Sequence, residues 1–156
     1  MAEVVLKRIV NVSIETAWDI WDDYGNIANF HPLLSGSHVL EESGGESTGL
    51  GCKRVCEFKD GKNYLKEEII AYEPYQKIVI NVYESTMPLK EAKAIITFNA
   101  LHPYSTEVTF TMQFIPKMGL LGKMITPLMK MQFSKMLGQM MDAFADYAHG
   151  VDKKAA

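Results

Sequence analysis

The chain has 156 residues, of which 47% are hydrophobic and 22% are charged, and its formal net charge is −3. These values are typical of one globular domain and exclude disordered and collagen-like classes. The negative net charge comes with no stripe of basic residues that could bind a nucleic acid. The sequence also contains no run of about 18 apolar residues, the length that a membrane-spanning helix needs. The opening MAEVVLKRIV lacks the apolar core and cleavage site of a secretory signal, so we expect a cytoplasmic protein.

The first part of the chain predicts a strand followed by two short helices. Residues 3–12 are rich in Val and Ile, as strands are. Ser13 is a good N-cap for the helix in SIETAWDIWDDYG, and Gly25 is placed to end that helix. Residues 26–30 are compatible with one more helical turn before His31-Pro32, because the residue before a proline favours an extended backbone.

Six further strands are predicted in the middle of the chain. Asp60-Gly61 is a specific hairpin signal, because both central residues of a type I′ turn need positive φ. The short connections between successive strands imply antiparallel pairing. The predicted strands span residues 37–42, 51–58, 64–72, 77–84, 92–100 and 107–115.

A long helix is predicted from Thr126 to Ala148, roughly 33 Å in length. Thr126-Pro127 has the pattern of an N-cap followed by proline at the first helical position, and Gly150 is placed to stop the helix. Residues 1–150 are therefore expected to form a single domain, and residues 151–156 a frayed tail.

Residues 118–125 precede this helix and contain two glycines and several apolar side chains. Three interpretations stay open for them: a movable lip, a turn that packs the start of the helix, or brief contact with a membrane. A single lysine and a few apolar residues favour the third interpretation least.

The long helix has five methionines between Thr126 and Met141, and most of them fall on one face. Met131 is the exception, because it falls among the polar residues of the opposite face. A methionine stripe is either ordinary core or a compliant cavity wall, since Met has three rotatable bonds and a polarizable sulfur. The predicted sheet-facing arc holds Met129, Phe133, Met136, Leu137, Met140, Ala143, Phe144 and Tyr147.

The alternation of residues along the strands places two charges, Arg54 and Glu67, on the apolar face of the sheet. Burying a lone charge costs several kcal/mol, so these groups are expected to form an ion pair, to contact a ligand in a partly hydrated pocket, or both. The predicted inward sets are Cys52, Arg54, Cys56 and Phe58; Leu65, Glu67, Ile69 and Ala71; Ile78, Ile80 and Val82; Ala92, Ala94, Ile96 and Phe98; and Val108, Phe110, Met112 and Phe114.

The sequence predicts neither a disulfide nor a metal site nor a cofactor. Cys52 and Cys56 are the two cysteines, and four residues along a strand separate them by roughly 13 Å, too far for a disulfide. The four histidines are dispersed and complete no zinc pattern. Glycine-rich signatures for phosphate or dinucleotide binding are absent, so no nucleotide cofactor is expected.

The whole chain resembles the START-like helix-grip superfamily, and within it the polyketide cyclase/dehydrase (SRPBCC) family. The block AWDIWDDYGNIANFHP, the G-x-x-R of residues 51–54 and the E-x-I-x-x-Y-E of residues 67–73 carry the resemblance, in this order ahead of the long helix. It implies an α+β fold in which a seven-stranded curved antiparallel sheet wraps around a long C-terminal helix, with two short helices between strands 1 and 2.

The resemblance also implies a cavity for a hydrophobic small molecule between sheet and helix. In the abscisic acid receptors of this superfamily, the glutamate that matches Glu67 reaches the ligand through water, and the arginine that matches Arg54 lies near the pocket. The receptor gate sequences are not evident here, and Ala92 and Ala94 stand where receptors place polar contacts. A hormone receptor is therefore not expected.

We expect a binding or carrier protein for a hydrophobic or aromatic, lipid- or polyketide-like small molecule, with no nucleic-acid partner and no stable membrane insertion. The alternative is a polyketide cyclase/aromatase or dehydratase with Glu67 as general acid/base and Arg54 and Tyr147 in support. A third possibility is an interaction module, for which the sequence indicates no partner surface. The predicted ligand-binding residues are Arg54, Phe58, Glu67, Ile80, Ala94, Phe110, Met129, Phe133, Met136, Met140 and Tyr147.

Two observations weigh against the enzyme. The sequence contains no Ser-His-Asp order, no paired inward carboxylates and no nucleophile elbow. His31 could act as a base near the cavity mouth, but a histidine before Pro32 is more readily explained as a lock on the turn.

Overall fold

A computed structural model describes the backbone of residues 1–155 and the side chains of residues 1–151. The chain forms one strand, then two short helices, then six strands and finally one long helix. The elements are β1 (Ala2–Val10), α1 (Ile14–Asp22), the 3-10 helix η1 (Tyr24–Asn29), β2 (Leu34–Glu41), β3 (Lys53–Phe58), β4 (Tyr64–Glu73), β5 (Lys77–Ser85), β6 (Leu89–His102), β7 (Ser105–Pro116) and α2 (Gly119–Ala155).

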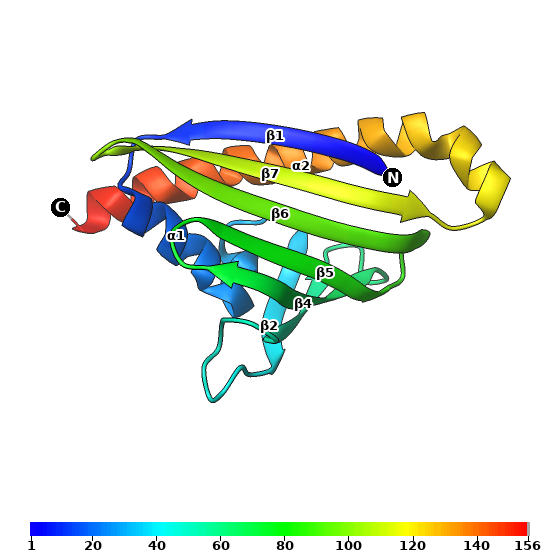
Figure 1. Cartoon of the computed structure of the whole chain (residues 1–156), viewed down its shortest axis with the longest axis horizontal. Helices are drawn as coiled ribbons and strands as arrows, with labels where there is room; N and C mark the ends of the chain where they lie inside the picture. Colours follow the sequence, from blue (N-terminus) through cyan, green and yellow to red (C-terminus); the bar gives the residue numbers. More distant parts are fainter. Residues whose placement is uncertain (156) are drawn as a thin grey trace.

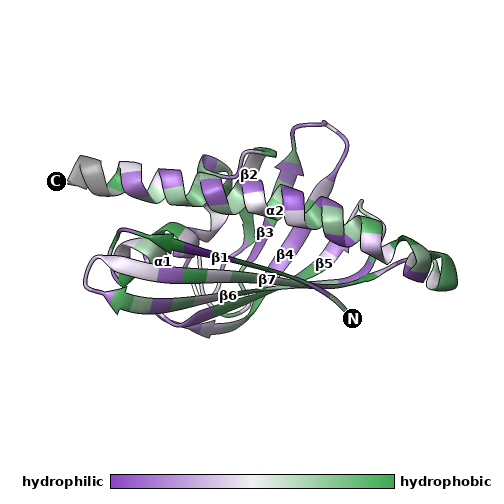
Figure 2. Cartoon of the chain, turned by 90° about the horizontal axis from the view of Figure 1, so that it is seen from above, coloured by the Kyte–Doolittle hydropathy of each residue, from purple (hydrophilic) through white to green (hydrophobic). Residues whose placement is uncertain are grey.

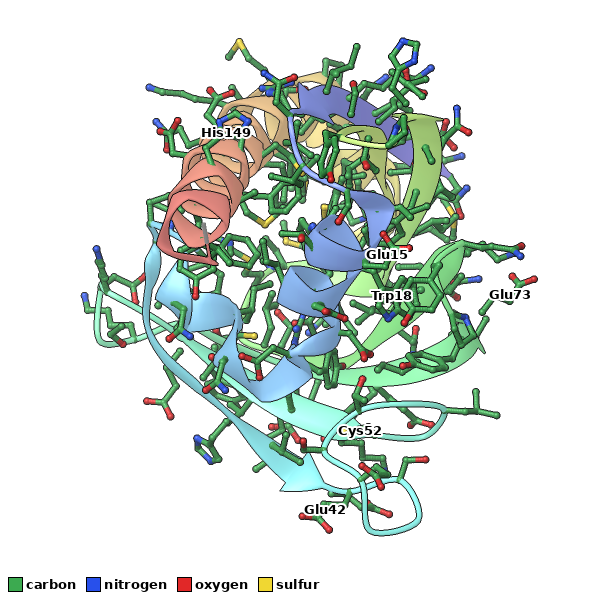
Figure 3. All side chains as sticks on the ribbon, turned by 90° about the vertical axis from the view of Figure 1, so that its left-hand side faces the viewer. Glu15, Trp18, Glu42, Cys52, Glu73 and His149 are labelled. Atoms are coloured by element: carbon green, nitrogen blue, oxygen red, sulfur yellow. The ribbon has the colours of Figure 1, made fainter. Side chains whose placement is uncertain are left out.

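The seven strands form one antiparallel sheet in the order β1-β7-β6-β5-β4-β3-β2. The long helix α2 runs along the inner face of this sheet beside β1 and β7, and α1 with η1 closes one end (Figures 1 and 2). This arrangement confirms the expected helix-grip fold. Seen from the end that carries α1, side chains from both layers fill the space between them, and Trp18 extends from α1 toward the sheet (Figure 3).

The first helix begins where the sequence predicts but ends earlier. The Ser13 Oγ accepts a hydrogen bond from the backbone N–H of Thr16 at 3.2 Å, which confirms Ser13 as the N-cap. The helix ends at Asp22, and Gly25 lies inside η1 rather than at a helix stop. The prediction for Gly25 is therefore wrong.

Gly25 instead allows η1 to approach β2 closely. A Cβ atom on Gly25 would lie 2.8 Å from Val39 Cγ2, closer than real side chains pack. At the same point the Ser37 hydroxyl donates to the carbonyl of Gly25 at 2.8 Å and accepts from the N–H of Ala28 at 3.1 Å. Such a contact across the fold leaves no signal in the local sequence.

An irregularity in the β4–β5 pairing reverses the faces of the end of β4. Ile69 pairs with Ile80 but Ala71 pairs with Val79, so the register shifts between them. One extra residue in a strand turns every later side chain to the other face. Tyr72 therefore packs inward, with its ring centroid 5.4 Å from that of Trp18, and the prediction that Ala71 faces inward is wrong.

The helix α2 is longer than predicted at both ends. It begins at Gly119, where Met118 and Gly119 both have positive φ, and it contains Pro127 in its interior. The first turns bend away from the axis of the rest (Figure 1), as expected where a proline removes a backbone N–H. Residues 118–125 are thus mainly the first turns of this helix.

At the other end α2 passes through Gly150, so the predicted stop is wrong. A glycine ends a helix when it adopts a left-handed conformation, and Gly150 does not. The frayed tail predicted for residues 151–156 stays a prediction, because Ala156 and the side chains from 152 onward lie outside the described residues.

The predicted inner face of α2 is confirmed in its main features. Met129, Phe133, Met140 and Phe144 are buried, whereas Met131 is exposed on the opposite side. Across the described residues, no helix is both long and apolar enough to cross a bilayer.

Candidate functional site

Two neighbouring strands bring Arg54 and Glu67 face to face in the interior. Arg54 on β3 pairs directly with Glu67 on β4 in the register of the sheet. The two side chains form an ion pair, with 3.2 Å between Arg54 Nε and Glu67 Oε1. Both residues are buried, 3% and 7% exposed respectively. The sequence predicted both inward positions, and the structure adds the pairing.

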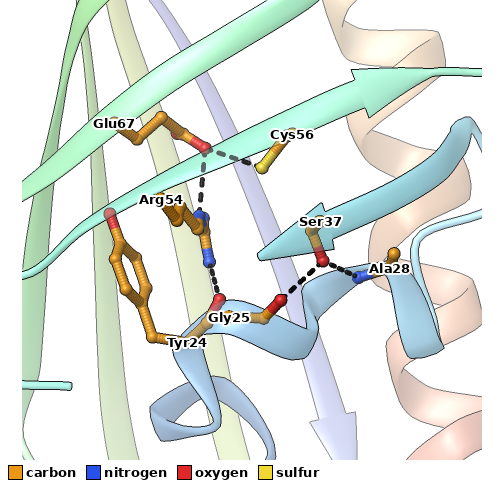
Figure 4. Close-up of polar contacts among 7 residues, drawn as sticks. All are labelled: Tyr24, Gly25, Ala28, Ser37, Arg54, Cys56 and Glu67. Atoms are coloured by element: carbon orange, nitrogen blue, oxygen red, sulfur yellow. Dashed lines mark hydrogen bonds and ion pairs between the residues drawn. The ribbon is translucent and has the colours of Figure 1, made fainter. Parts of the chain in front are cut away.

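Neighbouring groups form further hydrogen bonds with Arg54 and Glu67 beyond the ion pair itself (Figure 4). Arg54 Nη1 donates to the backbone carbonyl of Tyr24 at 2.9 Å, and the guanidinium carbon lies 4.1 Å from the centroid of the Tyr24 ring. The Cys56 thiol donates to Glu67 Oε1 at 3.2 Å. Burial by itself lowers the pKa of Arg54, but the adjacent Glu67 carboxylate raises it, so the net shift is upward.

The thiol and the phenol beside this pair are neutral. Burial is the largest cause that raises the pKa of Cys56 and of Tyr24. Both cysteines are free and buried, as predicted. Among the described residues, no group of three or more His, Cys, Asp or Glu side chains is arranged to hold a metal ion.

The ion pair lines an internal cavity of about 80 Å³ between the sheet and α2. A second compartment of about 70 Å³ lies beside it toward the start of α2, and the two share lining residues that include His31, Phe58 and Met112. The first compartment is lined by Ile27, His31, Leu34, Arg54, Cys56, Phe58, Leu65, Glu67, Ile80, Val82, Ala92, Lys93, Ala94, Phe110, Met112, Leu137 and Met140. The second is lined by His31, Phe58, Leu65, Val82, Met87, Leu89, Met112, Phe133, Met136 and Leu137.

The polar groups are concentrated in the first compartment. Arg54, Glu67, Cys56 and His31 line it together, whereas the second compartment is apolar apart from His31. This distribution would orient a ligand that has an apolar body and one polar group.

His31 was predicted mainly to lock a turn, but in the structure it also lines the cavity. Its Nδ1 accepts a hydrogen bond from the N–H of Leu33 at 3.3 Å, so it does lock the turn as predicted. It also lines both compartments. Burial is the largest cause that lowers the pKa of His31, to about 4, so the ring is neutral near pH 7. With Nδ1 occupied as an acceptor, the proton resides on Nε2, which makes His31 a hydrogen-bond donor.

The compartments are small compared with typical ligand sites, which measure roughly 300–1,000 Å³. A water needs about 10–15 Å³, so the present volume has room for several waters or a small fragment. Four methionines form part of the walls: Met87, Met112, Met136 and Met140. Their flexible side chains can move to enlarge the cavity at low cost.

Nine of the eleven predicted ligand-binding residues line these compartments, where a ligand would contact them. They are Arg54, Phe58, Glu67, Ile80, Ala94, Phe110, Phe133, Met136 and Met140. Met129 instead packs in a separate apolar cluster, and Tyr147 stacks beside Phe30 near the surface, with ring centroids 5.8 Å apart. Tyr147 lines neither compartment, whereas Glu67 lines the first.

Solved structures with the same fold are similar over nearly their whole length. A START superfamily protein from Mycobacterium smegmatis superposes with a TM-score of 0.81 at 14% identity, covering 96% of this chain and 98% of that one. The Zhui aromatase/cyclase from Streptomyces gives 0.79 at 13%, covering 95% and 93%. A norcoclaurine synthase point mutant from Thalictrum, in complex with a transition-state analogue, gives 0.74 at 13%, covering 97% and 96%. At these identities the likeness shows the fold alone.

No curated protein sequence matches the chain. The family model described as polyketide cyclase / dehydrase and lipid transport matches residues 1–149. Together with the helix-grip sheet and the cavity beneath α2, this match over almost the whole chain shows that the protein belongs to that family.

Proposed function

We propose that the protein binds and carries a small hydrophobic or aromatic molecule in the space between the sheet and α2. One observation supports this most: Arg54, Glu67 and His31 line the same compartment of the internal cavity, and apart from Cys56 and Lys93 the other lining residues are apolar and include methionines. Such a site orients a ligand through a few polar contacts and gains affinity from apolar burial.

The polar region indicates what the ligand offers. His31 can donate a hydrogen bond from Nε2, so a carbonyl or hydroxyl oxygen is a suitable partner. Glu67 has one oxygen, Oε1, bound to Arg54 and Cys56, and among the described contacts Oε2 has none. A ligand hydroxyl or a bridging water fits that second oxygen. A lipid- or polyketide-like molecule with one oxygenated end has this chemistry.

The alternative function is a cyclase/aromatase or dehydratase reaction, and the position of His31 favours it as the second candidate. A neutral imidazole and a carboxylate line the same compartment, which is the set that proton transfer needs. Similar folds include an aromatase/cyclase and a norcoclaurine synthase. We favour the carrier because the Oε1 atom of Glu67 is already engaged by Arg54 and Cys56, so this oxygen is not free to contact a substrate.

The carrier proposal is tested by filling the cavity. Ala94→Leu adds three carbon atoms to the wall of the first compartment, and Ala100→Leu adds the same group at an exposed position on the same strand. We expect Ala94→Leu to weaken binding of anilinonaphthalene sulfonate, a fluorescent aromatic probe, by about tenfold or more. Ala100→Leu should leave binding unchanged. Equal binding by both variants would show that the probe does not enter this cavity.

The enzyme alternative is separated from the carrier by His31→Asn. The Asn side chain can still accept from the N–H two residues on, so the turn is kept while the imidazole is removed. If a polyketide-like substrate is turned over by the parent, and turnover but not binding is lost in His31→Asn, the carrier proposal is overturned. The carrier requires only a modest change of affinity.

A further inference from the structure

The first turns of α2 carry large apolar side chains on the surface. Leu120 is 80% exposed and Met124 is 78% exposed, and the residues that continue this surface are also more than half exposed. The apolar stripe, as we name this surface, consists of Met118, Leu120, Leu121, Met124, Leu128 and Met131. Figure 2 shows the hydrophobic colouring at this end of the helix.

The apolar stripe is distinct from the face of α2 that packs on the sheet. At about 100° per residue, residues 120–131 of the stripe occupy an outward arc of about 100°. The buried side chains Met129 and Phe133 lie on the opposite side. A helix that covers a sheet needs one apolar face, and these turns have two. Beyond Met131 the outward face becomes polar, with Gln132, Lys135 and Gln139 exposed.

The charged residues of the chain segment that carries the apolar stripe are all positive. Lys117, Lys123, Lys130 and Lys135 are exposed, and the sequence has no Asp or Glu between Glu107 and Asp142. This contrasts with the whole chain, whose net charge is −3. An exposed apolar helix face whose own charged residues are all lysines is the pattern of a helix that lies in the interface of an anionic bilayer.

We propose that the apolar stripe docks the protein reversibly on an anionic lipid surface. The apolar side chains enter the headgroup boundary and the lysines contact the lipid phosphates and carboxylates. A second copy of the chain suits this surface less, because a symmetric contact would bring two sets of lysines together. Docking would bring the bilayer toward the second compartment, because Phe133, one of its lining residues, lies two positions beyond Met131 on α2.

The test is co-sedimentation of the full chain with vesicles. One set contains phosphatidylcholine and phosphatidylserine, and the other contains phosphatidylcholine alone. Leu120→Ser/Met124→Ser removes the two most exposed side chains of the stripe, and Leu50→Ser is the matched control, because Leu50 is 61% exposed in a loop elsewhere. We expect the double variant to lower partitioning onto anionic vesicles about tenfold and the control to have no effect.

A charge variant tests the second half of the proposal. Lys123→Gln/Lys130→Gln should reduce binding to anionic vesicles several-fold, and added salt should do the same to the parent protein. The proposal is overturned if the parent does not sediment with anionic vesicles, or if Leu120→Ser/Met124→Ser sediments like the parent. It is also overturned if sedimentation velocity shows a dimer that depends on the stripe while vesicle binding is absent. None of these outcomes depends on a ligand in the cavity.

Discussion

Arg54 and Glu67 combine the two roles that the sequence left open. They form a buried ion pair, and both side chains line the cavity. Removing two charges from water is costly, so such a pair persists where further hydrogen bonds and stacking compensate it. Here the Tyr24 carbonyl and ring, and the Cys56 thiol, supply that compensation. The ion pair is thus a polar group held in a fixed position among mainly apolar side chains.

Replacing Glu67 should destabilise the protein strongly. Glu67→Gln leaves the Arg54 charge buried without its counterion, and we expect a loss of about 3 kcal/mol in the free energy of unfolding, measured by urea denaturation. Glu57→Gln, at an exposed position on the neighbouring strand β3, should change it by less than about 0.5 kcal/mol. Equal stability of the two variants would mean that water in the cavity already solvates Arg54.

His31 makes the stability of the fold depend on pH. Because burial lowers its pKa to about 4 while the unfolded chain keeps a value near 6.5, the unfolded state binds more protons between these two pH values. The stabilisation by neutral His31 is complete above about pH 6.5 and is lost as the pH falls to about 4. It amounts to at most roughly 3 kcal/mol.

His31→Asn should remove this part of the pH dependence. The free energy of unfolding of the parent should fall more steeply than that of His31→Asn between pH 6.5 and pH 4, as measured by urea denaturation across the range. His102→Asn, at an exposed position at the end of β6, serves as the control and should follow the parent. Parallel curves for all three proteins would refute the assigned burial of His31.

At the scale of elements, the start of α2 depends on a close approach between Gly122 and the end of β7. A Cβ atom on Gly122 would collide with the backbone carbonyl of Lys117, and the N–H of Gly122 bonds the carbonyl of Met118 at 3.3 Å. The helix can therefore begin directly after the strand. Residues 118–125 form the first turns of α2 because this contact is available.

Gly122→Ala and Gly138→Ala should have opposite effects on the same helix. Alanine favours a helix over glycine by about 1 kcal/mol, and the space at Gly138 accepts a Cβ at 3.8 Å from Arg8 Nη2. Gly138→Ala should thus be neutral or stabilising. Gly122→Ala should cost about 1–3 kcal/mol and raise amide hydrogen exchange in residues 119–126. Protection that is unchanged in Gly122→Ala would show that the contact does not hold the start of α2.

At the scale of the whole molecule, the interior is hollow but small. The two compartments of about 80 and 70 Å³ lie below the size of typical ligand sites, so a ligand of ordinary size requires side chains to move. Of the six methionines of α2, two line the compartments, Met136 and Met140. Met129 and Met141 are buried in apolar clusters, and Met124 and Met131 are exposed. We expect the side chains of Met136 and Met140 to move when a larger ligand enters the cavity.

The methionine hypothesis is tested by the double variant Met136→Leu/Met140→Leu. Leucine conserves volume, so the free energy of unfolding should change by less than about 1.5 kcal/mol. The stiffer leucine side chains should lower the affinity for large apolar probes about tenfold and leave small ones unaffected, as measured by titration calorimetry. Met129→Leu/Met131→Leu is the control, and an equal response of both double variants to probe size would assign the methionines to ordinary core.

The element types, their order along the chain and the inward positions of Arg54 and Glu67 could be predicted from the residues alone. These rest on local information: strand alternation, the Ser13 cap, the Asp60-Gly61 turn and the helical periodicity after Thr126. Each is visible within a few residues of chain, because side-chain direction follows from the period of the element.

Other features became visible only once the elements were packed together. They are the ion pair, the position of His31 in the cavity wall, and the absence of Met129 and Tyr147 from that wall. The β4 register shift that turns Tyr72 inward and the true start of α2 are also among them. These features depend on which residues of distant elements meet in space. A local period carries no information about a shift in register or about the close contacts that require glycine at positions 25 and 122, so these features appear only when the elements are packed together.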